Sequence, residues 1–159
     1  MSAIIGKKVP AWQLPATADQ VIKSSQLKGR NIVLYFYPRD STPGCTTEAQ
    51  DFRDHIKQFE KLNAVVLGVS KDTLKSHEKF KDKQQLPFEL LSDEDEKLCQ
   101  LFDVIKLKKM YGKEFEGIER STFLIDNKGV LRREWRKVKV KGHVEEVLQE
   151  LEELQGSAQ

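Results

Sequence analysis

The sequence is short of cysteine, and the cysteines it has are poorly placed for a scaffold. There are two among 159 residues, Cys45 and Cys99, and no C-x-x-C pair. Two thiols cannot build a disulfide framework, and the lack of closely spaced pairs excludes a zinc ribbon or a dithiol redox motif. The count leaves open a single reactive thiol, an inert buried thiol, or one of each.

Long apolar runs and an excess of one charge are also missing. No window approaches the roughly 18 consecutive apolar residues of a membrane span, and the first ten residues are too polar for a signal peptide. Lysine and arginine number 27 against 25 aspartate and glutamate, a net charge of +2. This balance argues against a nucleic-acid or membrane partner. We expect a cytoplasmic protein, because free thiols persist in that reducing compartment.

The length of the chain indicates one domain spanning residues 1–159. A chain of this size buries a sufficient core without disulfides or metal ions. No internal repeat, low-complexity tract or long linker divides it. The segment 155–159 is the one stretch that we expect to be disordered.

Apolar patterning predicts strands alternating with helices. The runs Asn31–Tyr37 and Ala64–Ser70 are typical of strands covered on both faces, and Pro38 ends the first of them. This order predicts an α/β fold with a mixed central sheet flanked by helices. The other predicted elements are helices around 45–59, 72–83, 93–102 and 144–154, a strand at 87–91, and a hairpin of 120–126 with 130–140.

The segment between the first strand and its helix holds the most informative residues. Thr42 is a candidate N-cap, Pro43 occupies the preferred first helical position, and Cys45 falls in the first turn. Amide groups without intrahelical partners and the positive end of the helix dipole favour a thiolate there. A lone cysteine is more often a small core residue, but this setting makes a reactive thiol the better interpretation.

The helical spacing also predicts where the sulfur points. Cys45 shares a stripe with Ala49 and Phe52, so it should face an enclosed site rather than bulk water. Glu48 would oppose a thiolate unless a cation such as Arg39, Arg53 or Arg120 engages it.

These residues carry a specific resemblance. Pro38, Thr42 and Cys45 reproduce the P-x-x-x-T-x-x-C signature of peroxiredoxins, and the wider stretch YFYPRDSTPGCTTE resembles the bacterioferritin-comigratory (peroxiredoxin Q) subfamily. The segment GIERSTFLID at 117–126 is similar to the later strand that carries the family's arginine. The resemblance implies a thioredoxin-like fold and the reduction of peroxides without a cofactor or metal.

The resemblance also implies a role for each matching residue. Cys45 would be the peroxidatic nucleophile, which attacks a peroxide oxygen and becomes a sulfenic acid. Thr42 would hydrogen-bond the peroxide, Arg120 would stabilise the thiolate and the leaving oxygen, and Pro38 would shield the sulfur. The substrate would also contact the start of the helix at Pro43 and Gly44.

The sequence departs from the subfamily in the second thiol. The two positions at which relatives carry a resolving cysteine are Gln50 and Lys81 here. We therefore expect a one-cysteine mechanism, in which an external thiol (thioredoxin, glutaredoxin or glutathione) reduces the sulfenic acid. The alternatives are an atypical two-cysteine enzyme using Cys99, a redox sensor or relay of the same fold, and an inert binding module. The resemblance favours a monomer.

Three other features predict no further chemistry. His55, His77 and His143 lack paired metal-ligand spacing and are expected to be surface or hydrogen-bonded histidines. The basic stretch Arg132–Lys141 alternates in a way typical of the solvated face of an edge strand, which we prefer to a nucleic-acid strip. Lys106–Glu116 is expected to be a basic loop.

Overall fold

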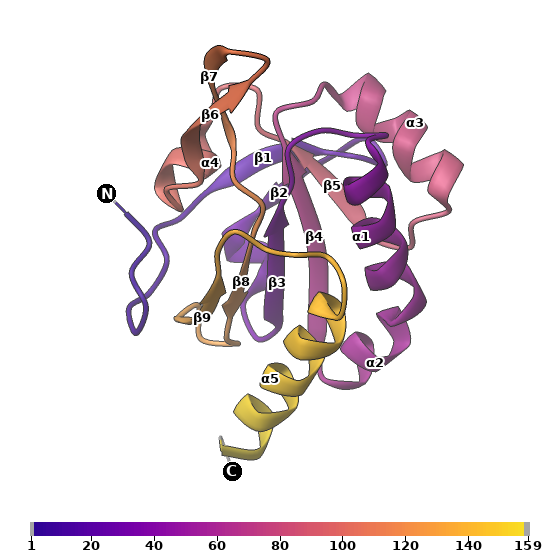
Figure 1. The fold of residues 1–159 in the computed structure, drawn as a ribbon. Helices are drawn as coiled ribbons and strands as arrows, with labels where there is room; N and C mark the ends of the chain where they lie inside the picture. Colours follow the sequence, from indigo (N-terminus) through magenta and orange to yellow (C-terminus); the bar gives the residue numbers. More distant parts are fainter. Residues whose placement is uncertain (1, 158–159) are drawn as a thin grey trace.

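The computed structural model describes residues 2–157, and its centre is a seven-stranded mixed sheet (Figure 1). Its strands are β1 (Gln13–Ala16), β2 (Gln20–Lys23), β3 (Asn31–Phe36), β4 (Ala64–Ser70), β5 (Glu89–Ser92), β8 (Ser121–Ile125) and β9 (Leu131–Trp135). Their spatial order is β2-β1-β5-β4-β3-β8-β9. Strands β3, β4 and β5 are parallel, whereas β8 runs antiparallel to β3. The predicted α/β fold with a mixed sheet is confirmed.

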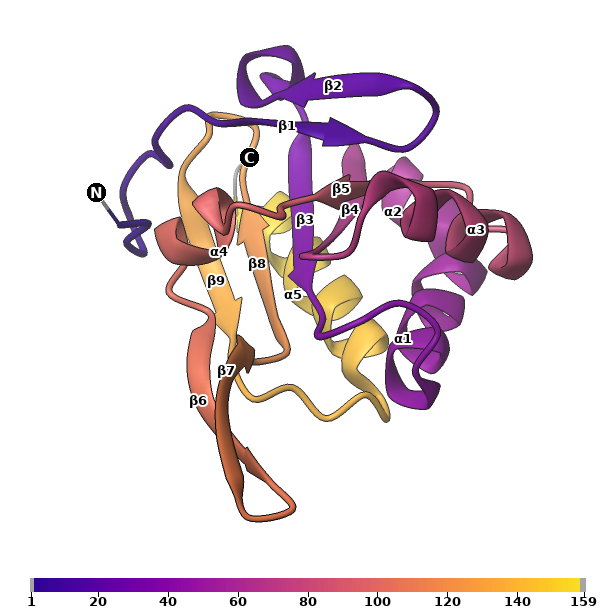
Figure 2. The same ribbon diagram turned by 90° about the horizontal axis from the view of Figure 1, so that it is seen from above.

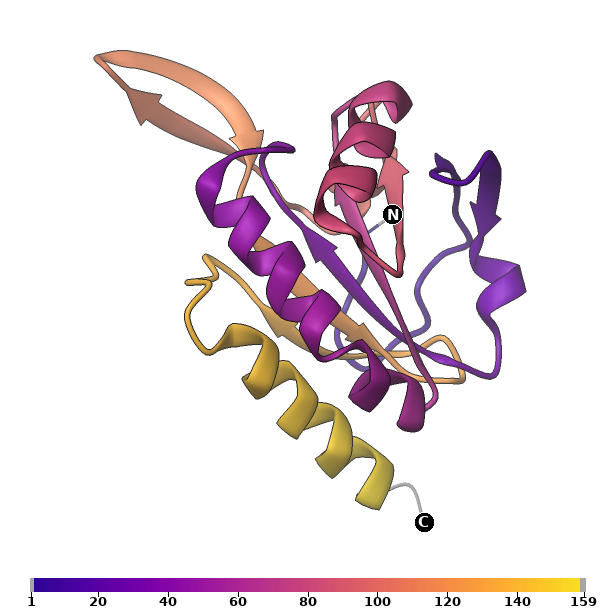
Figure 3. The same ribbon diagram turned by 90° about the vertical axis from the view of Figure 1, so that its right-hand side faces the viewer.

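Helices cover both faces of this sheet. They are α1 (Pro43–Asp54), α2 (Ile56–Lys61), α3 (Leu74–Gln84), α4 (Lys97–Leu101), α5 (His143–Ser157) and a short 3-10 turn, η1 (Ser24–Leu27). Helices α1, α2, α3 and α5 contribute to one core cluster, and α4 contributes to the other. Figure 3 shows α1 and α5 together on one side of the strands, with the N-terminal segment on the opposite side.

Strand β3 separates the two cores. All six of its residues are buried, and successive side chains of a strand point to opposite faces. Val33 and Tyr35 belong to the cluster that contains Cys45, whereas Leu34 and Phe36 belong to the cluster that contains Cys99. The two cysteines therefore lie on opposite faces of the sheet.

The structure corrects several sequence-based expectations. The helix predicted across 45–59 breaks at His55, because the His55 ring donates from Nδ1 to the carbonyl of Asp51 at 2.7 Å. A continuing helix would offer that carbonyl to the backbone amide of residue 55. The segment 155–157, expected to be disordered, continues α5, and Gln155 donates to the carbonyl of Leu62. The rest of the predicted tail, 158–159, lies outside the described residues.

A second correction concerns the predicted basic loop. Strands β6 (Ile105–Met110) and β7 (Lys113–Ile118) form an antiparallel hairpin there. Lysines at every second or third position hid the strand pattern, because the hairpin pairs only with itself and buries apolar residues only at its base, at Ile105 and Ile118. Strands β1 and β2 were not predicted either.

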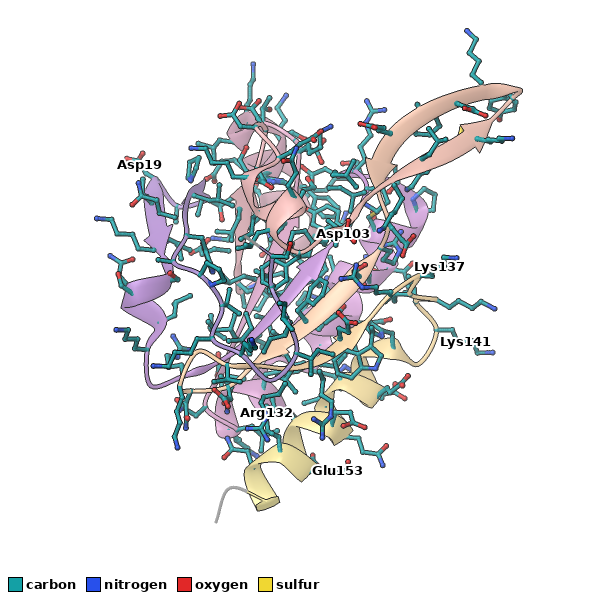
Figure 4. The ribbon with its side chains drawn as sticks, turned by 90° about the vertical axis from the view of Figure 1, so that its left-hand side faces the viewer. Asp19, Asp103, Arg132, Lys137, Lys141 and Glu153 are labelled. Atoms are coloured by element: carbon teal, nitrogen blue, oxygen red, sulfur yellow. The ribbon has the colours of Figure 1, made fainter. Side chains whose placement is uncertain are left out.

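The basic stretch near the end of the chain is partly as expected. Strand β9 forms the edge of the sheet but ends at Trp135, short of the predicted 140. Lys137 and Lys141 then point away from the body (Figure 4). In the described part of the chain, no helix combines the length and the apolar character needed to cross a bilayer.

Close packing around β4 gives the first testable prediction. A methyl group on Gly68 would lie 2.8 Å from Leu90 Cδ2 and 2.9 Å from Tyr35 Cζ. Both neighbours are completely buried, so Gly68→Ala should lower the free energy of unfolding by about 1–3 kcal/mol. Gly117→Ala is the matched control, because its methyl group meets nothing closer than 3.5 Å. Urea unfolding measures both; equal stabilities would contradict the prediction.

Candidate active site

The loop after β3 and the first turn of α1 position the reactive segment. Thr42 is the N-cap of α1 and Pro43 lies at its start, as predicted. The Thr42 side chain does not cap the helix; its hydroxyl donates to the carbonyl of Arg39 at 2.9 Å. The Thr42 oxygen therefore keeps its acceptor capacity for another donor. Pro38 and Gly44 are half-buried beside this turn, and Pro43 is exposed.

Arg120 brings the site together from the far end of the chain. The Cys45 side chain is buried, with 1% of its surface exposed. Arg120 Nη2 donates to Cys45 Sγ at 3.4 Å, and Nη1 donates to Glu48 Oε1 at 2.7 Å. Of the three cations considered for Glu48, Arg120 is the one that engages it. A guanidinium at the sulfur favours the thiolate and would also stabilise negative charge that develops on a bound oxygen.

Gly44 makes this contact geometrically feasible. A Cβ atom at position 44 would lie 3.1 Å from Arg120 Nη2, which is closer than ordinary van der Waals contact. A larger residue at this position would require the guanidinium to shift by a few tenths of an ångström. Glycine therefore favours the close approach of Arg120 to Cys45, and its backbone shows no positive φ.

Glu48 is an unusual partner for the guanidinium. Its side chain is fully buried, and among the described residues its Oε2 has no hydrogen-bond partner. Burial raises the pKa of Glu48 to about 7, against the opposing effect of the Arg120 charge. Arg120 has a raised pKa because of Glu48 and Cys45, in spite of its desolvation. The cation is therefore fixed, and Glu48 titrates near neutrality.

Two groups near Arg120, His143 and Tyr35, are neutral at physiological pH. Burial, followed by the Arg120 charge, lowers the pKa of His143 to about 4, and His143 Nε2 lies 2.8 Å from Thr122 Oγ1. Burial, followed by the charge of Glu48, raises the pKa of Tyr35. His143 therefore adds no second cation beside Arg120, and Tyr35 adds no further anion that would compete for the guanidinium.

A second buried hydrogen-bond network, centred on Asp40, anchors the loop between β3 and α1. Asp40 accepts from Tyr37 Oη at 2.6 Å, from Ser76 Oγ at 2.8 Å and from His77 Nδ1 at 2.7 Å. His77 Nε2 donates to the carbonyl of Leu91 at 3.0 Å. This network ties the loop that carries Pro38 and Thr42 to α3 and β5. Sequence reasoning missed it, because nothing in a lone histidine indicates a partner 37 positions away.

The same network contains the one potential metal cluster found among residues 2–157. Asp40, Asp72 and His77 each offer an atom within 4.8 Å of the others. All three side chains already take part in hydrogen bonds, including those from the Asp40 amide and Ser70 Oγ to Asp72 Oδ2. The arrangement is explained by hydrogen bonding alone.

Cys99 has a different environment from Cys45. It is completely buried on the other face of the sheet. Burial and the nearby Asp93 carboxylate raise its pKa well above the ordinary thiol value, which keeps the thiol protonated and weakly nucleophilic. Asp93 also accepts from the backbone amides of Leu98 and Cys99, which anchors α4.

Comparisons with known proteins identify the family of the chain. The model of the AhpC/TSA family matches residues 5–134. Peroxiredoxin Bcp of Bacillus subtilis (strain 168) is 56% identical over 154 residues, which cover 97% of this chain and 98% of that protein.

Solved structures of peroxiredoxins are similar to this chain in both fold and sequence. The bacterioferritin comigratory protein of Xanthomonas campestris, studied for alkyl peroxide reduction, matches with a TM-score of 0.87 and 48% identity over 91% of this chain and 92% of that one. A mutant of Xylella fastidiosa PrxQ matches with a TM-score of 0.90 and 45% identity over 96% and 97%. The fold is thioredoxin-like, as the sequence resemblance implied.

The titration of Glu48 predicts a pH-dependent stability. Its pKa is raised on folding, so its contribution is fully present below about pH 4.5 and is lost as the pH rises through about 7. Between pH 5 and pH 8, the wild type should lose up to about 3 kcal/mol relative to Glu48→Gln. Urea unfolding of both proteins at the two pH values measures the difference. His143 titrates in both proteins, so its effect cancels; parallel curves would contradict the prediction.

The Asp40 network predicts strong energetic coupling. Asp40→Ala should cost about 3–5 kcal/mol, because it leaves the buried His77 ring and Tyr37 hydroxyl without an acceptor. In a double-mutant cycle, His77→Leu should cost much less in the Asp40→Ala background than alone. Asp54→Ala is the control, since its ion pair with Arg53 is exposed and should contribute about 0–1 kcal/mol. Simple additivity in the cycle would refute the coupling.

Proposed function

The chain belongs to the AhpC/TSA family and is a thiol-dependent peroxidase, and we propose that Cys45 is its only reacting cysteine. The substrates in this proposal are hydrogen peroxide and organic hydroperoxides. The observation that carries it is the contact of Arg120 Nη2 with Cys45 Sγ in the first turn of α1. Cys99 lies on the other face of the sheet, and burial together with Asp93 raises its pKa in spite of the opposing Lys71 charge.

In the oxidising step, the Cys45 thiolate attacks the terminal oxygen of the peroxide. An S–O bond forms as the O–O bond breaks, the sulfur loses two electrons, and the leaving oxygen departs as an alkoxide or hydroxide that takes up a proton. Charge moves from the sulfur to the leaving oxygen, and Arg120 is placed to stabilise both ends of that movement. The Thr42 oxygen can accept the hydrogen bond of the peroxide O–H.

Glu48 sets how much of the Arg120 charge the sulfur receives. When Glu48 is neutral, the guanidinium is left to the thiolate; when Glu48 is ionised, two anions share one cation. Because the pKa of Glu48 is about 7, this division changes near physiological pH. Pro38 and the backbone of Pro43 and Gly44 form the rim of the site in this proposal.

The reducing step requires thiols from outside the chain. One thiol attacks the sulfenic sulfur and releases water, leaving a mixed disulfide; a second thiol then attacks that disulfide and releases the Cys45 thiolate. The two positions at which relatives carry a resolving cysteine serve packing instead. Gln50 Nε2 donates to Gln84 Oε1 at 2.8 Å, and Lys81 forms an ion pair with Glu89. Both contacts hold α3 in place rather than supply a thiol.

The proposal includes the setting in which the enzyme works. Thioredoxin, glutaredoxin with glutathione, or glutathione itself supplies the thiols. The cytoplasm is the compartment that fits two free thiols, and the enzyme acts as a monomer.

Separate cysteine variants test the one-cysteine mechanism. Cys45→Ser should abolish peroxide consumption, because no nucleophile remains at the Arg120 guanidinium. Cys99→Ser should keep at least about half of the wild-type rate, since a conservative change at a buried site far from the chemistry acts through stability alone. Peroxide consumption with excess dithiothreitol measures both. An equal loss in the two variants would sink the mechanism, and a single oxidation without turnover in the wild type would identify a sensor.

A further inference from the structure

The β6–β7 hairpin is the one element that stands apart from the body of the protein. Figures 2 and 4 show it extending beyond the sheet and helices. Its two strands pair with each other and with no strand of the large sheet. Its own packing therefore requires no large apolar side chains.

Large apolar side chains nevertheless concentrate on this hairpin. Of the eight large hydrophobic residues that the described chain exposes, four lie within these few residues. They are Leu107, Met110, Tyr111 and Phe115, with 63%, 56%, 97% and 42% of their surface exposed. Single exposed hydrophobic residues are ordinary, but a cluster of this kind marks an interaction surface.

Tyr111 occupies a backbone conformation that destabilises the hairpin turn. Met110 pairs with Lys113, so Tyr111 and Gly112 form a two-residue turn, with φ of 53° and 76°. Such turns favour Asn-Gly, because the first residue must adopt the left-handed conformation. A tyrosine there costs on the order of 1 kcal/mol, and it gains no packing in return because it is almost fully exposed.

The two faces of the hairpin differ in charge. Directly opposed residues share a face, so Lys109 and Leu107 lie with Glu114 and Glu116 on one side. The other side carries Lys106, Lys108, Met110, Lys113 and Phe115. That second set, here called the basic face, is positively charged and apolar, with no carboxylate among its hairpin residues.

The basic face adjoins the reactive cysteine. Lys108 is half-buried, and its pKa is lowered by burial and next by the Arg120 charge, with Cys45 acting in the opposite direction. Both groups are therefore electrostatic neighbours of Lys108. Strand β7 leads directly into Arg120 through Glu119, so the hairpin rises from the rim of the site.

We propose that the basic face is the docking surface for a protein reductant, a dithiol protein with an acidic rim around its reactive thiol. The inference rests on the proposed one-cysteine function, because electrons must then reach Cys45 from outside. The lysines would attract an acidic partner, and Tyr111, Met110 and Phe115 would supply the apolar contacts of its centre. A second copy of this chain is disfavoured, because two basic faces repel each other.

Tyr111→Asn tests the docking surface without weakening the hairpin. Asparagine suits the turn better than tyrosine, so any loss of partner binding cannot come from unfolding of β6 and β7. With thioredoxin and its reductase as the electron source, Tyr111→Asn and Lys113→Glu should each raise the KM for thioredoxin at least about fivefold, near 1 kcal/mol. Glutaredoxin with glutathione is assayed in parallel, and the same increase is expected there if that system supports turnover.

Two readouts and two control variants separate docking from chemistry. Oxidation of Cys45 by hydrogen peroxide and turnover with dithiothreitol should be unchanged in both variants. Val21→Ser and Lys28→Glu are the matched controls, because they alter exposed residues at the far side of the sheet, and they should leave the KM for the protein reductant unchanged.

The outcomes that overturn the proposal are distinct from those that overturn the peroxidase mechanism. An unchanged KM in both hairpin variants refutes the docking surface. So does turnover supported by glutathione alone but by neither protein, which leaves the peroxidase mechanism intact. Loss of binding to anionic phospholipid vesicles with an unchanged KM would assign the face to a membrane instead. Failure of Cys45 to react with peroxide would overturn the one-cysteine function, and with it the docking proposal.

Discussion

One guanidinium shared by two buried acids is the constraint on which the rest of the site depends. The Arg120 side chain is 17% exposed and lies between Cys45 Sγ and Glu48 Oε1. Burying a cation is costly unless its partners are well placed, and here both acids come from the same two turns of α1. The desolvation that raises the pKa of Glu48 to about 7 keeps a share of Glu48 neutral near pH 7, and the neutral form leaves the guanidinium to the sulfur. A more exposed Glu48 would ionise fully and take that charge away.

The topology of the sheet brings residues 45 and 120 together. Strand β8 pairs antiparallel with β3 in the middle of the sheet. The residues that precede β8 therefore lie beside the residues that follow β3. The Asp40–His77 network fixes the loop between β3 and α1 against α3, and Gly44 leaves the space for the guanidinium. Each of these features restricts a motion that would increase the distance between the sulfur of Cys45 and the guanidinium of Arg120.

The sequence predicted the elements that are determined by neighbouring residues or by a recognisable motif. The apolar run at 64–70 matches β4, and the helix start at Thr42 and Pro43 follows from capping preferences that act over a few residues. The cation that engages Glu48 was left open among three arginines, and Arg120 was assigned to the thiolate through the resemblance alone, since nothing local distinguishes it. The break at His55 and the Asp40–His77 pair were beyond prediction, because a side chain that takes a backbone carbonyl, or a partner 37 positions away, leaves no periodic signal.

The hairpin shows why the reducing half of the reaction was hardest to predict. A strand pattern depends on one buried face, and β6 and β7 bury residues only at their base, so their lysines resembled those of a loop. Because the resolving cysteine is missing, the proposed mechanism needs an external reductant, and the hairpin is the docking surface that we propose for it. With Gln50 and Lys81 holding α3 to its neighbours, the chain contributes no thiol from those positions, and in the proposed mechanism the reductant comes from outside the chain. The peroxide reaction depends on the buried contacts of Arg120, and the docking that we propose depends on exposed residues such as Tyr111, so separate substitutions can alter the two.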